Sequence, residues 1–484
     1  MKNIFLLSLA IIAVCSCSSP KSLEFITTTE SSPWETQAPV TAERIEGDFD
    51  LTIDTSSRQQ TMEGFGTCFN ELGWTSLQRL DENEREGILR ELFAPGAGAS
   101  FVICRMPVAA NDFSLDWYSY NEVDGDFAMQ NFSIDNDRKT LIPFIKSALA
   151  HQPELRIWAS PWSPPSWMKH NKHYASRSTA AMARRMAASG STYMTKVVDN
   201  GLPEDRQGSE GTDMFICEDP YYKAYALYFA KFIEAYRNEG IDIFAVMPQN
   251  EFNSAQIFPS CCWTAAGLAR FIGDYLGPAM ENEGVELMFG TMERANEALV
   301  DTILTDAEAG RFVKGIGFQW AGKNAVPGIH KRYPDMKLYQ TEQECGNGKN
   351  DWKGATYSWN LMKHYLNNGV SAYMYWNTSL MEGGISRWGW AQNSLVVVRE
   401  DNSWSFTHEY YIMKHLSHYV VPGAVKLATG GGYEDALAFL NPDGSVVVAA
   451  GNSSDAPVTL RMNINGTAYS PVLKPASVST ILFR

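Results

Sequence analysis

The residues that point most clearly to chemistry are Asn250 and Glu251, near the end of the stretch Ile241–Phe252. The first part of this stretch is apolar and partly β-branched, which is typical of a parallel strand that is buried on both faces. The polar residues that end the stretch should therefore leave the core. In barrels of alternating strands and helices, catalytic groups lie at the carboxyl ends of the strands, so Glu251 is a candidate catalytic acid.

A second stretch, Lys337–Gly346, also runs from an expected strand into acidic residues, Glu342 and Glu344. Two carboxylates that arrive from different strand ends are what cleavage of a glycosidic bond needs, one as proton donor and the other as nucleophile or base. Taken alone, an Asn-Glu pair after a strand is more often a helix cap or a salt-bridge partner. The catalytic interpretation therefore depends on what the other strand ends carry.

Apolar runs recur along the chain at intervals that suit a strand followed by a helix. Helical stretches such as Tyr221–Asn238 and Ala265–Met280 lie between them, and Thr264 is a suitable N-cap for the second. Eight strand–helix repeats predict an α/β fold, a (β/α)₈ TIM barrel. The eight expected strands are Met62–Phe69, Phe101–Val108, Leu155–Ser160, Ile241–Met247, Val285–Gly290, Gly315–Trp320, Lys337–Gln340 and Ala372–Trp376.

The character of the sequence changes near Pro422, where short β-type runs alternate with turn residues such as those of Asn441–Gly444. We expect a side all-β sandwich domain over 421–484, completed by an N-terminal strand within 43–60 that starts near Phe49. The catalytic barrel then spans 61–420. The expected C-terminal strands are Ala436–Leu440, Val446–Ala450, Val458–Met462 and Val478–Phe483.

One connection inside the barrel is unusually long. Lys169–Phe215 follows the third expected strand and shows little periodicity. Loops of this length are usually functional or disordered. Because the segment leaves the carboxyl end of its strand, we expect it to overhang the active-site face.

Composition and charge narrow the class of ligand. A formal net charge of −15 argues against nucleic acid as a partner, since nucleic acid attracts basic patches, whereas a neutral substrate is compatible with it. The cysteines beyond the N-terminus form no CxxC pair, so no metal site is expected, and no organic cofactor is implied. A disulfide between Cys217 and Cys261 or Cys262 is conceivable, because the chain is expected to be exported.

The N-terminus has the pattern of an export signal. Lys2 precedes the apolar run Ile4–Val14, which is too short to span a membrane, and Val14-Cys15-Ser16-Cys17 resembles a bacterial lipobox. We expect residues 1–17 to be a lipoprotein signal peptide, Cys17 to be lipidated, and 18–42 to be a flexible tether. The protein is then a cell-envelope lipoprotein, on the surface or the periplasmic side of the outer membrane, attached to the membrane only by this lipid. Ordinary cleavage to a freely secreted protein is the alternative, and no oligomeric state is indicated.

Several strand ends carry motifs that together resemble one known family. The motifs are CRMPVAANDFSLDWYSY, IWASPWSPPSW and MPQNE, and their order and spacing are specific. From about Gly64 to the C-terminus the chain resembles glycoside hydrolase family 30, the family of glucosylceramidases and endo-β-1,6-glucanases. The resemblance implies a barrel fused to a side β-sandwich and a retaining mechanism without a metal or an organic cofactor.

The resemblance also implies roles for individual residues. Glu251 corresponds to the acid/base and Glu342 to the nucleophile, because the family's nucleophile directly follows a small Ser or Thr, here Thr341. Glu344 remains the rival, since residues two apart on a strand share a face. The subsite for the glucosyl unit is expected to contain Arg105, Asp112, Trp162, Asn250, Trp320 and Trp376.

Departures from the family pattern bear on the substrate. Gln319-Trp320-Ala321 stands where glucosylceramidases that resemble this chain carry His-Trp-Tyr, so one tyrosine near the nucleophile is missing. Trp388 and Trp390 form an expected sugar-stacking platform beyond the eighth strand, although packing of the loop explains either of them equally well. Flat aromatic rings and nearby amides favour a soluble glucan over a ceramide.

We therefore expect a retaining glycoside hydrolase that cleaves β-glucosidic bonds, most specifically an endo-β-1,6-glucanase. A glucosylceramidase, or a β-glucosidase or β-xylosidase for small substrates, uses the same chemistry and remains an alternative. A non-catalytic glycan-binding surface lipoprotein is a remote alternative, because its signature would be the loss of one carboxylate and both are present. In each case the partner is a β-glucan or a β-glucoside.

Overall fold

The structure, a computed structural model, describes residues 21–191, 193–194 and 196–484. Eight parallel strands close into a barrel in the order β10-β11-β4-β5-β6-β7-β8-β9. Each forms from one of the predicted apolar runs, and nearly all of their side chains are buried, as expected for strands covered on both faces. The barrel strands are β4 (Gly64–Cys68), β5 (Ile103–Val108), β6 (Arg156–Pro161), β7 (Ile243–Val246), β8 (Glu286–Met292), β9 (Val313–Gln319), β10 (Lys337–Glu342) and β11 (Val370–Asn377).

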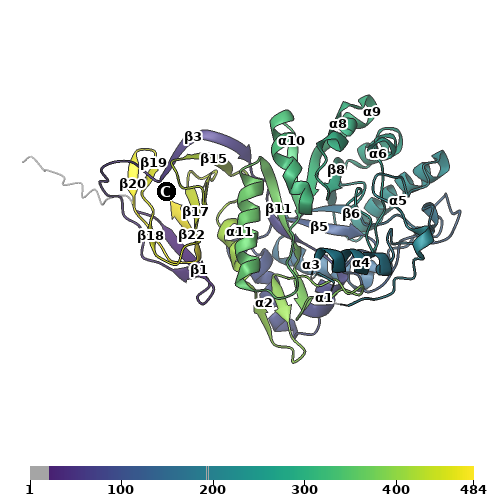
Figure 1. Ribbon diagram of the computed structural model, residues 1–484, viewed down its shortest axis with the longest axis horizontal. Coiled ribbons are helices and arrows are strands. Elements are labelled where there is room, and N and C mark those ends of the chain that lie inside the picture. The colour runs from purple at the N-terminus through teal and green to yellow at the C-terminus, as the bar shows by residue number, and fades with distance from the viewer. Residues whose placement is uncertain (1–20, 192, 195) are drawn as a thin grey trace, which may run out of the picture.

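Helices cover the outside of the barrel (Figure 1). Several begin at a capping side chain that accepts a hydrogen bond from the backbone N–H three residues later, among them Asp81, Thr264 and Asp351. The larger helices are α1 (Glu71–Leu77), α2 (Glu82–Phe93), α3 (Leu141–His151), α5 (Asp219–Asn238), α6 (Ala265–Phe271), α7 (Gly277–Glu283), α8 (Glu297–Thr305), α10 (Val326–Arg332), α11 (Trp352–Leu366) and α12 (His408–Ser417). A π-helical turn, Ile272–Leu276, joins α6 to α7, so the stretch predicted as one helix is interrupted.

A second, all-β unit lies beside the barrel (Figure 1). Its main sheet has the order β2-β1-β22-β17-β16-β15-β3-β19-β20, and β18 pairs with β21. The predicted fold class, a TIM barrel with a side β-sandwich, is confirmed. The strands are β1 (Glu24–Thr29), β2 (Glu35–Thr36), β3 (Leu51–Thr61), β15 (Val425–Gly430), β16 (Ala436–Leu440), β17 (Val446–Asn452), β18 (Val458–Thr459), β19 (Met462–Ile464), β20 (Thr467–Tyr469), β21 (Val472–Leu473) and β22 (Ser477–Phe483).

The sheet is apolar on both faces. Along β17, Val446, Val448 and Ala450 enter the core of the sandwich, whereas Val447 and Ala449 belong to the core that is continuous with the barrel. The alternation follows from the two-residue period of a strand. The sandwich is therefore packed firmly against the barrel. The contact includes His415 of α12, whose two ring nitrogens lie 2.9 Å from the hydroxyls of Thr28 and Thr480.

Part of the expected tether is a strand instead. Residues 24–29 form β1, which pairs antiparallel with β22 from Glu24–Leu482 to Thr29–Ser477. The Ser, Thr and Pro content of 18–42 suggested a flexible segment, but Ile26 and the threonines of β1 are β-branched and favour a strand. The signal peptide and the lipidation of Cys17 concern residues outside the described part of the chain.

The long segment after β6 is also more regular than expected. It contains α4 (Thr179–Ser189), which begins at the capping side chain of Ser178 and ends at Gly190 in the left-handed conformation. An isolated bridge between Lys169 and Phe215 closes the segment at its base. The remaining elements are the short helical turns at 137–139, 166–168, 204–206 and 320–325, α9 (Ala307–Gly310), and a small sheet of β12 (Ser379–Met381), β13 (Val396–Val398) and β14 (Trp404–Phe406).

Candidate active site

Glu251 lies just beyond the carboxyl end of β7, with its side chain inside the barrel mouth. Its backbone is in the left-handed region at φ 47°, which is uncommon for a residue other than glycine, and its N–H donates to the Thr291 hydroxyl at 2.9 Å. Gln319 donates to one carboxylate oxygen at 3.1 Å and Gln256 to the other at 3.2 Å. The side chain is buried and held by neutral donors.

Glu342 is the last residue of β10 and is also buried. Its Oε2 accepts hydrogen bonds from Arg105 Nη1 at 2.8 Å and from Gln319 Nε2 at 3.1 Å, and its Oε1 accepts one from Trp320 Nε1 at 2.9 Å. A guanidinium and two N–H donors favour the ionised carboxylate. Glu342 therefore has the contacts of an anion, which Glu251 lacks.

Arg105 of β5 is fully buried beneath the two carboxylates. Its guanidinium lies 4.2 Å from the ring centroid of Trp162 and donates to Asn250 Oδ1 at 2.7 Å and to Ser160 Oγ at 2.9 Å. These partners fix its plane and offset the cost of burying the charge. Arg105 thus links β5 to the ends of β6, β7 and β10.

The electrostatics separate the two acids. Burial, together with the Glu293 and Glu342 carboxylates, raises the pKa of Glu251 well above its usual range. Burial also raises the pKa of Glu342, but Arg105, Trp320 and Gln319 oppose that rise. Because the two nearby carboxyl groups have unequal surroundings, one can be protonated while the other is ionised.

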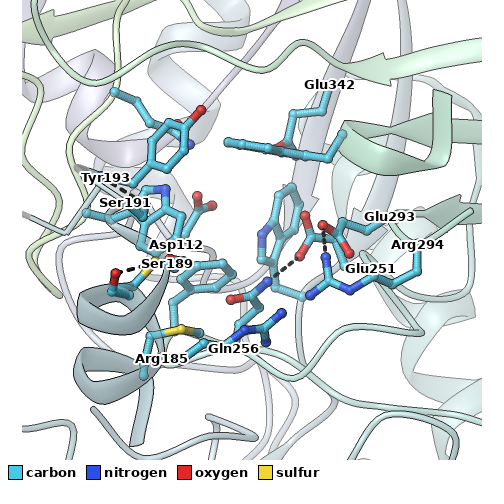
Figure 2. A pocket seen from close by; sticks show the side chains of 17 residues that line it. Asp112, Arg185, Ser189, Ser191, Tyr193, Glu251, Gln256, Glu293, Arg294 and Glu342 are labelled. Carbon is cyan, nitrogen blue, oxygen red and sulfur yellow. Dashed lines mark hydrogen bonds and ion pairs between the residues drawn. The ribbon is translucent and has the colours of Figure 1, made fainter. Parts of the chain in front are cut away.

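The two carboxyl groups open into a pocket of about 270 Å³ at the barrel mouth (Figure 2). Four of the predicted substrate-binding residues line it, Asp112, Trp162, Trp320 and Trp390. The 169–215 segment supplies another wall, so the prediction that this segment overhangs the site is correct. Its contribution is Met182, Arg185, Met186, Ser189, Ser191 and Tyr193.

Most of the predicted site residues come together. Asn250 bonds to Arg105, and Trp376 stacks on Trp162 with ring centroids 5.2 Å apart, although Trp376 itself lies behind the pocket wall. Trp388 is the exception, since its side chain is 1% exposed and packs on Trp117 at 4.7 Å. The stacking platform predicted for Trp388 and Trp390 is therefore wrong for Trp388, whose ring packs against another segment of the chain.

Glu344 faces away from the pocket. It bonds to Lys323 Nζ at 2.5 Å and to the Tyr357 hydroxyl at 2.8 Å. The backbone turns after β10 ends at Glu342, so the two-residue period that would place both acids on one face does not extend to Glu344.

Three contributors were not predicted from the sequence. Gln319 bridges both acids, Tyr193 stacks on Trp390 at 5.8 Å, and Glu293 lies beside Glu251. Gln319 and Glu293 lie at or just beyond the ends of β9 and β8, so the rule that identified Glu251 could have identified them too. Tyr193 carries no such signal because its position depends on the path of a long loop.

Within the described residues, no group of three or more His, Cys, Asp or Glu side chains is arranged to hold a metal ion. Cys217, Cys261 and Cys262 are free thiols, so the disulfide that was considered between them is absent from this structure. Among the helices in the described part of the chain, none has the length and apolar character needed to cross a membrane.

Comparison with known families agrees with this fold. The glycosyl hydrolase family 30 TIM-barrel domain matches residues 62–199 and 205–420, and the family 30 beta sandwich domain matches residues 423–481. The molecule is thus a glycoside hydrolase. It belongs to glycosyl hydrolase family 30.

Relatives with two different activities are similarly distant. The chain is 28% identical over 464 residues to endo-1,6-beta-D-glucanase neg1 of Aspergillus fumigatus, covering 90% of this chain and 88% of that protein. It is 26% identical over 464 residues to mouse lysosomal acid glucosylceramidase, covering 90% and 83%.

Two solved structures share the fold. SrfJ from Salmonella typhimurium matches with a TM-score of 0.82 at 21% identity, covering 96% of this chain and 99% of that one. The endo-beta1,6-glucanase BT3312 matches with a TM-score of 0.77 at 24% identity, covering 95% and 99%.

Proposed function

We propose that the protein is a retaining β-glycosidase in which Glu342 is the nucleophile and Glu251 the acid/base. The observation that carries the proposal is the shared donor Gln319. Its Nε2 lies 3.1 Å from an oxygen of each acid, so those two oxygens are separated by at most twice that distance. Carboxyl groups of retaining enzymes lie about 5–5.5 Å apart and those of inverting enzymes about 6.5–9.5 Å apart, so the spacing favours retention.

The proposed reaction has two displacements. Glu342 attacks the anomeric carbon while Glu251 donates its proton to the glycosidic oxygen, so that the C–O bond breaks, an alcohol leaves and a glycosyl ester forms. Glu251 then takes a proton from water, whose oxygen attacks the anomeric carbon and releases the Glu342 carboxylate. The raised pKa of Glu251 suits the first step, and the Arg105 contact suits the ionised nucleophile.

The glucosyl unit is proposed to lie over Trp162, with Asp112 and Asn250 binding its hydroxyls. Asp112 lines the pocket and its buried Oδ1 has no hydrogen-bond partner. The Asn250 carbonyl oxygen already accepts from Arg105, Thr291 and Gln319, which leaves the amide N–H₂ to donate to a ligand. A polyhydroxylated ligand satisfies such groups, whereas a purely apolar one leaves them unpaired.

For the substrate we propose β-1,6-linked glucan, cleaved internally. The fungal endo-1,6-beta-D-glucanase relative supports this, as does a pocket wall that carries Arg185, Ser189 and Ser191, which suits a sugar leaving group better than a ceramide. The glucosylceramidase relatives keep lipid or small-glycoside cleavage as the second candidate.

Product analysis separates these substrates. The purified protein is incubated with pustulan, a linear β-1,6-glucan, and in parallel with glucosylceramide and an aryl β-glucoside. A ladder of oligosaccharides from pustulan is expected. An intact polymer, with glucose released from the lipid or the aryl glycoside, would instead assign the protein to the glucosidases.

Variants of the acids test the mechanism. Glu342→Gln and Glu251→Ala should each remove most of the activity, and azide should partly restore Glu251→Ala on an aryl glucoside with a good leaving group, because azide resolves the ester without a general base. Glu344→Gln is the matched control and should keep much more activity than Glu342→Gln, since Glu344 contacts only Lys323 and Tyr357 in the bonds described above. Equal losses in the Glu344 and Glu342 variants would refute the assignment of the nucleophile.

We also propose that the chain is exported and lipidated at Cys17, on the strength of the N-terminal sequence pattern. Metabolic labelling with a fatty acid should mark the protein, and Cys17→Ala should abolish the label. An unlabelled protein in the culture medium would point to free secretion.

A further inference from the structure

Glu293 is a buried carboxylate with an unused acceptor. It directly follows β8, lines the pocket and is 6% exposed. Its Oε1 bonds to Arg294, whereas Oε2 is buried without a hydrogen-bond partner, and the Ser254 side chain lies near enough to oppose the rise in the carboxyl pKa that burial causes. A buried carboxylate oxygen without a donor is costly, so a donor from a bound ligand would stabilise it.

A second unused acceptor lies on the same side of the acid/base. Gln256 donates through Nε2 to Glu251 and to the Ser254 hydroxyl at 2.7 Å, while its Oε1 is buried without a partner. Gln256 also lines the pocket. Two acceptor oxygens, Glu293 Oε2 and Gln256 Oε1, therefore lie beside Glu251, and hydroxyl donors of a ligand could bond to them.

The position of these groups indicates which part of a substrate they meet. The Glu293 carboxylate helps to raise the pKa of Glu251, whereas the Glu342 carboxylate helps to raise the pKa of Asp112. In Figure 2 Glu293 and Arg294 lie beside Glu251, on the side away from Asp112. Since the acid/base protonates the bond to the leaving group, the groups beyond it face the leaving group rather than the glucosyl unit.

Arg294 is held in place from outside the pocket. It lies 3.2 Å from Glu210, which is also within 3.7 Å of Arg185 and 3.9 Å of Arg177. This network fixes Arg294 and through it Glu293, so that Oε2 is presented in one orientation. Pre-organised groups bind a ligand with less loss of conformational freedom.

We propose that Glu293 Oε2 and Gln256 Oε1 form a leaving-group subsite that accepts hydrogen bonds from the hydroxyls of a sugar. This inference rests on the proposed function and narrows it, because it makes the leaving group a carbohydrate. The same subsite holds an acceptor sugar when the glycosyl ester reacts with an alcohol instead of water.

Partitioning of the glycosyl ester tests the subsite. An aryl β-glucoside serves as donor, and methyl β-glucoside or methanol competes with water for the ester, so that each ratio of transfer to hydrolysis compares two fates of one intermediate. In Glu293→Gln the ratio for methyl β-glucoside should fall about tenfold, as expected when a hydrogen bond to a charged group is lost. The ratio for methanol should stay within about twofold, because methanol has no further hydroxyl to bind.

Glu283→Gln is the matched control. It removes an ion pair to Arg237, and neither residue lines the pocket, so it should leave both ratios near their wild-type values. Thermal unfolding of both variants shows whether they keep the fold.

The outcomes distinguish the two proposals. No turnover of any β-glucoside by the wild-type protein would refute the proposed function itself. Turnover with an unchanged ratio for methyl β-glucoside in Glu293→Gln, or equal falls for both acceptors, would refute the subsite and leave the proposed function intact. Transfer to the sugar that is no more efficient than transfer to methanol in the wild type would also refute it.

Discussion

Replacing Gln319 with leucine should damage catalysis and move its pH dependence together. Gln319 donates to Glu251, to Glu342 and to Asn250, each at 3.1 Å, and accepts from the Thr341 hydroxyl at 2.9 Å. Leucine fills a similar volume but donates nothing. The variant therefore removes a side chain that donates to both acids while leaving the barrel wall packed.

The size of the effect follows from the bonds that are lost. A hydrogen bond to a charged group contributes about 1.5–3 kcal/mol. The two amide hydrogens of Gln319 are shared among three acceptors, and Glu342 loses its negative charge as the ester forms. We therefore count one hydrogen bond to a charged group, the bond to Glu251. At about 1.4 kcal/mol for each factor of ten, kcat/KM should fall about 10- to 100-fold.

The direction of the pH shift follows from the same bonds. A donor favours the ionised carboxylate, and Gln319 lowers the pKa of both Glu251 and Glu342. Its loss should raise both pKa values. Ionisation of the nucleophile sets the acidic limb of the kcat/KM profile and ionisation of the proton donor sets the alkaline limb, so the whole bell should move to higher pH.

The assay is kcat/KM for an aryl β-glucoside and for a β-1,6-linked oligosaccharide, measured across the pH range. Gln343→Leu is the control for loss of a buried amide, since Gln343 bonds to Ser358 at 2.7 Å and to Tyr373 at 2.9 Å instead of the acids. A folded Gln319→Leu protein with kcat/KM within about threefold of wild type and an unmoved bell would refute the reasoning.

Two further predictions concern stability and the pocket wall. Trp388→Ala should lower the free energy of unfolding by about 3–5 kcal/mol, because its ring is buried. Trp390→Ala should chiefly raise KM for β-1,6-linked oligosaccharides, because its ring lines the pocket. Denaturant titration measures the first effect and steady-state kinetics the second, and the reverse pattern would restore Trp388 as a substrate contact. Burial raises the pKa of Asp137 to about 6 despite hydrogen bonds from three tyrosine hydroxyls. The protonated carboxyl favours the folded state, so this contribution is present at low pH and is lost as the pH rises from about 4 to about 6. The difference in melting temperature between the wild type and Asp137→Asn should become smaller over this pH range, and a constant difference would contradict the prediction.

The barrel could be predicted from the sequence because its strands are short, continuous apolar runs, a pattern that depends on burial alone. The strand β1 was missed because its residues, EFITTT, carry polar hydroxyls that resemble a linker, and only pairing with β22 some 450 residues later makes them a strand. Local composition does not report such a distant partner. The helix α4 was missed because it lies inside a long connection whose sequence shows little periodicity.

The candidate site divides in the same way. Glu251 and Glu342 could be predicted because each follows an expected apolar strand. The family resemblance assigned the other predicted residues of the site. Trp388 and Trp390 could not be told apart, since both lie in one loop and two residues of separation say nothing about which ring faces a ligand. Their difference depends on Trp117 and Tyr193, which reach the loop from other parts of the chain.

The pairing of β1 with β22 joins a segment that precedes the barrel to one that follows it. Before β22 is made, β1 can pair only with the two-residue strand β2. Loss of β22 would leave β1 and β17 with bare edges, which favour aggregation and degradation. During synthesis the sheet can therefore close only after the barrel segment has been made.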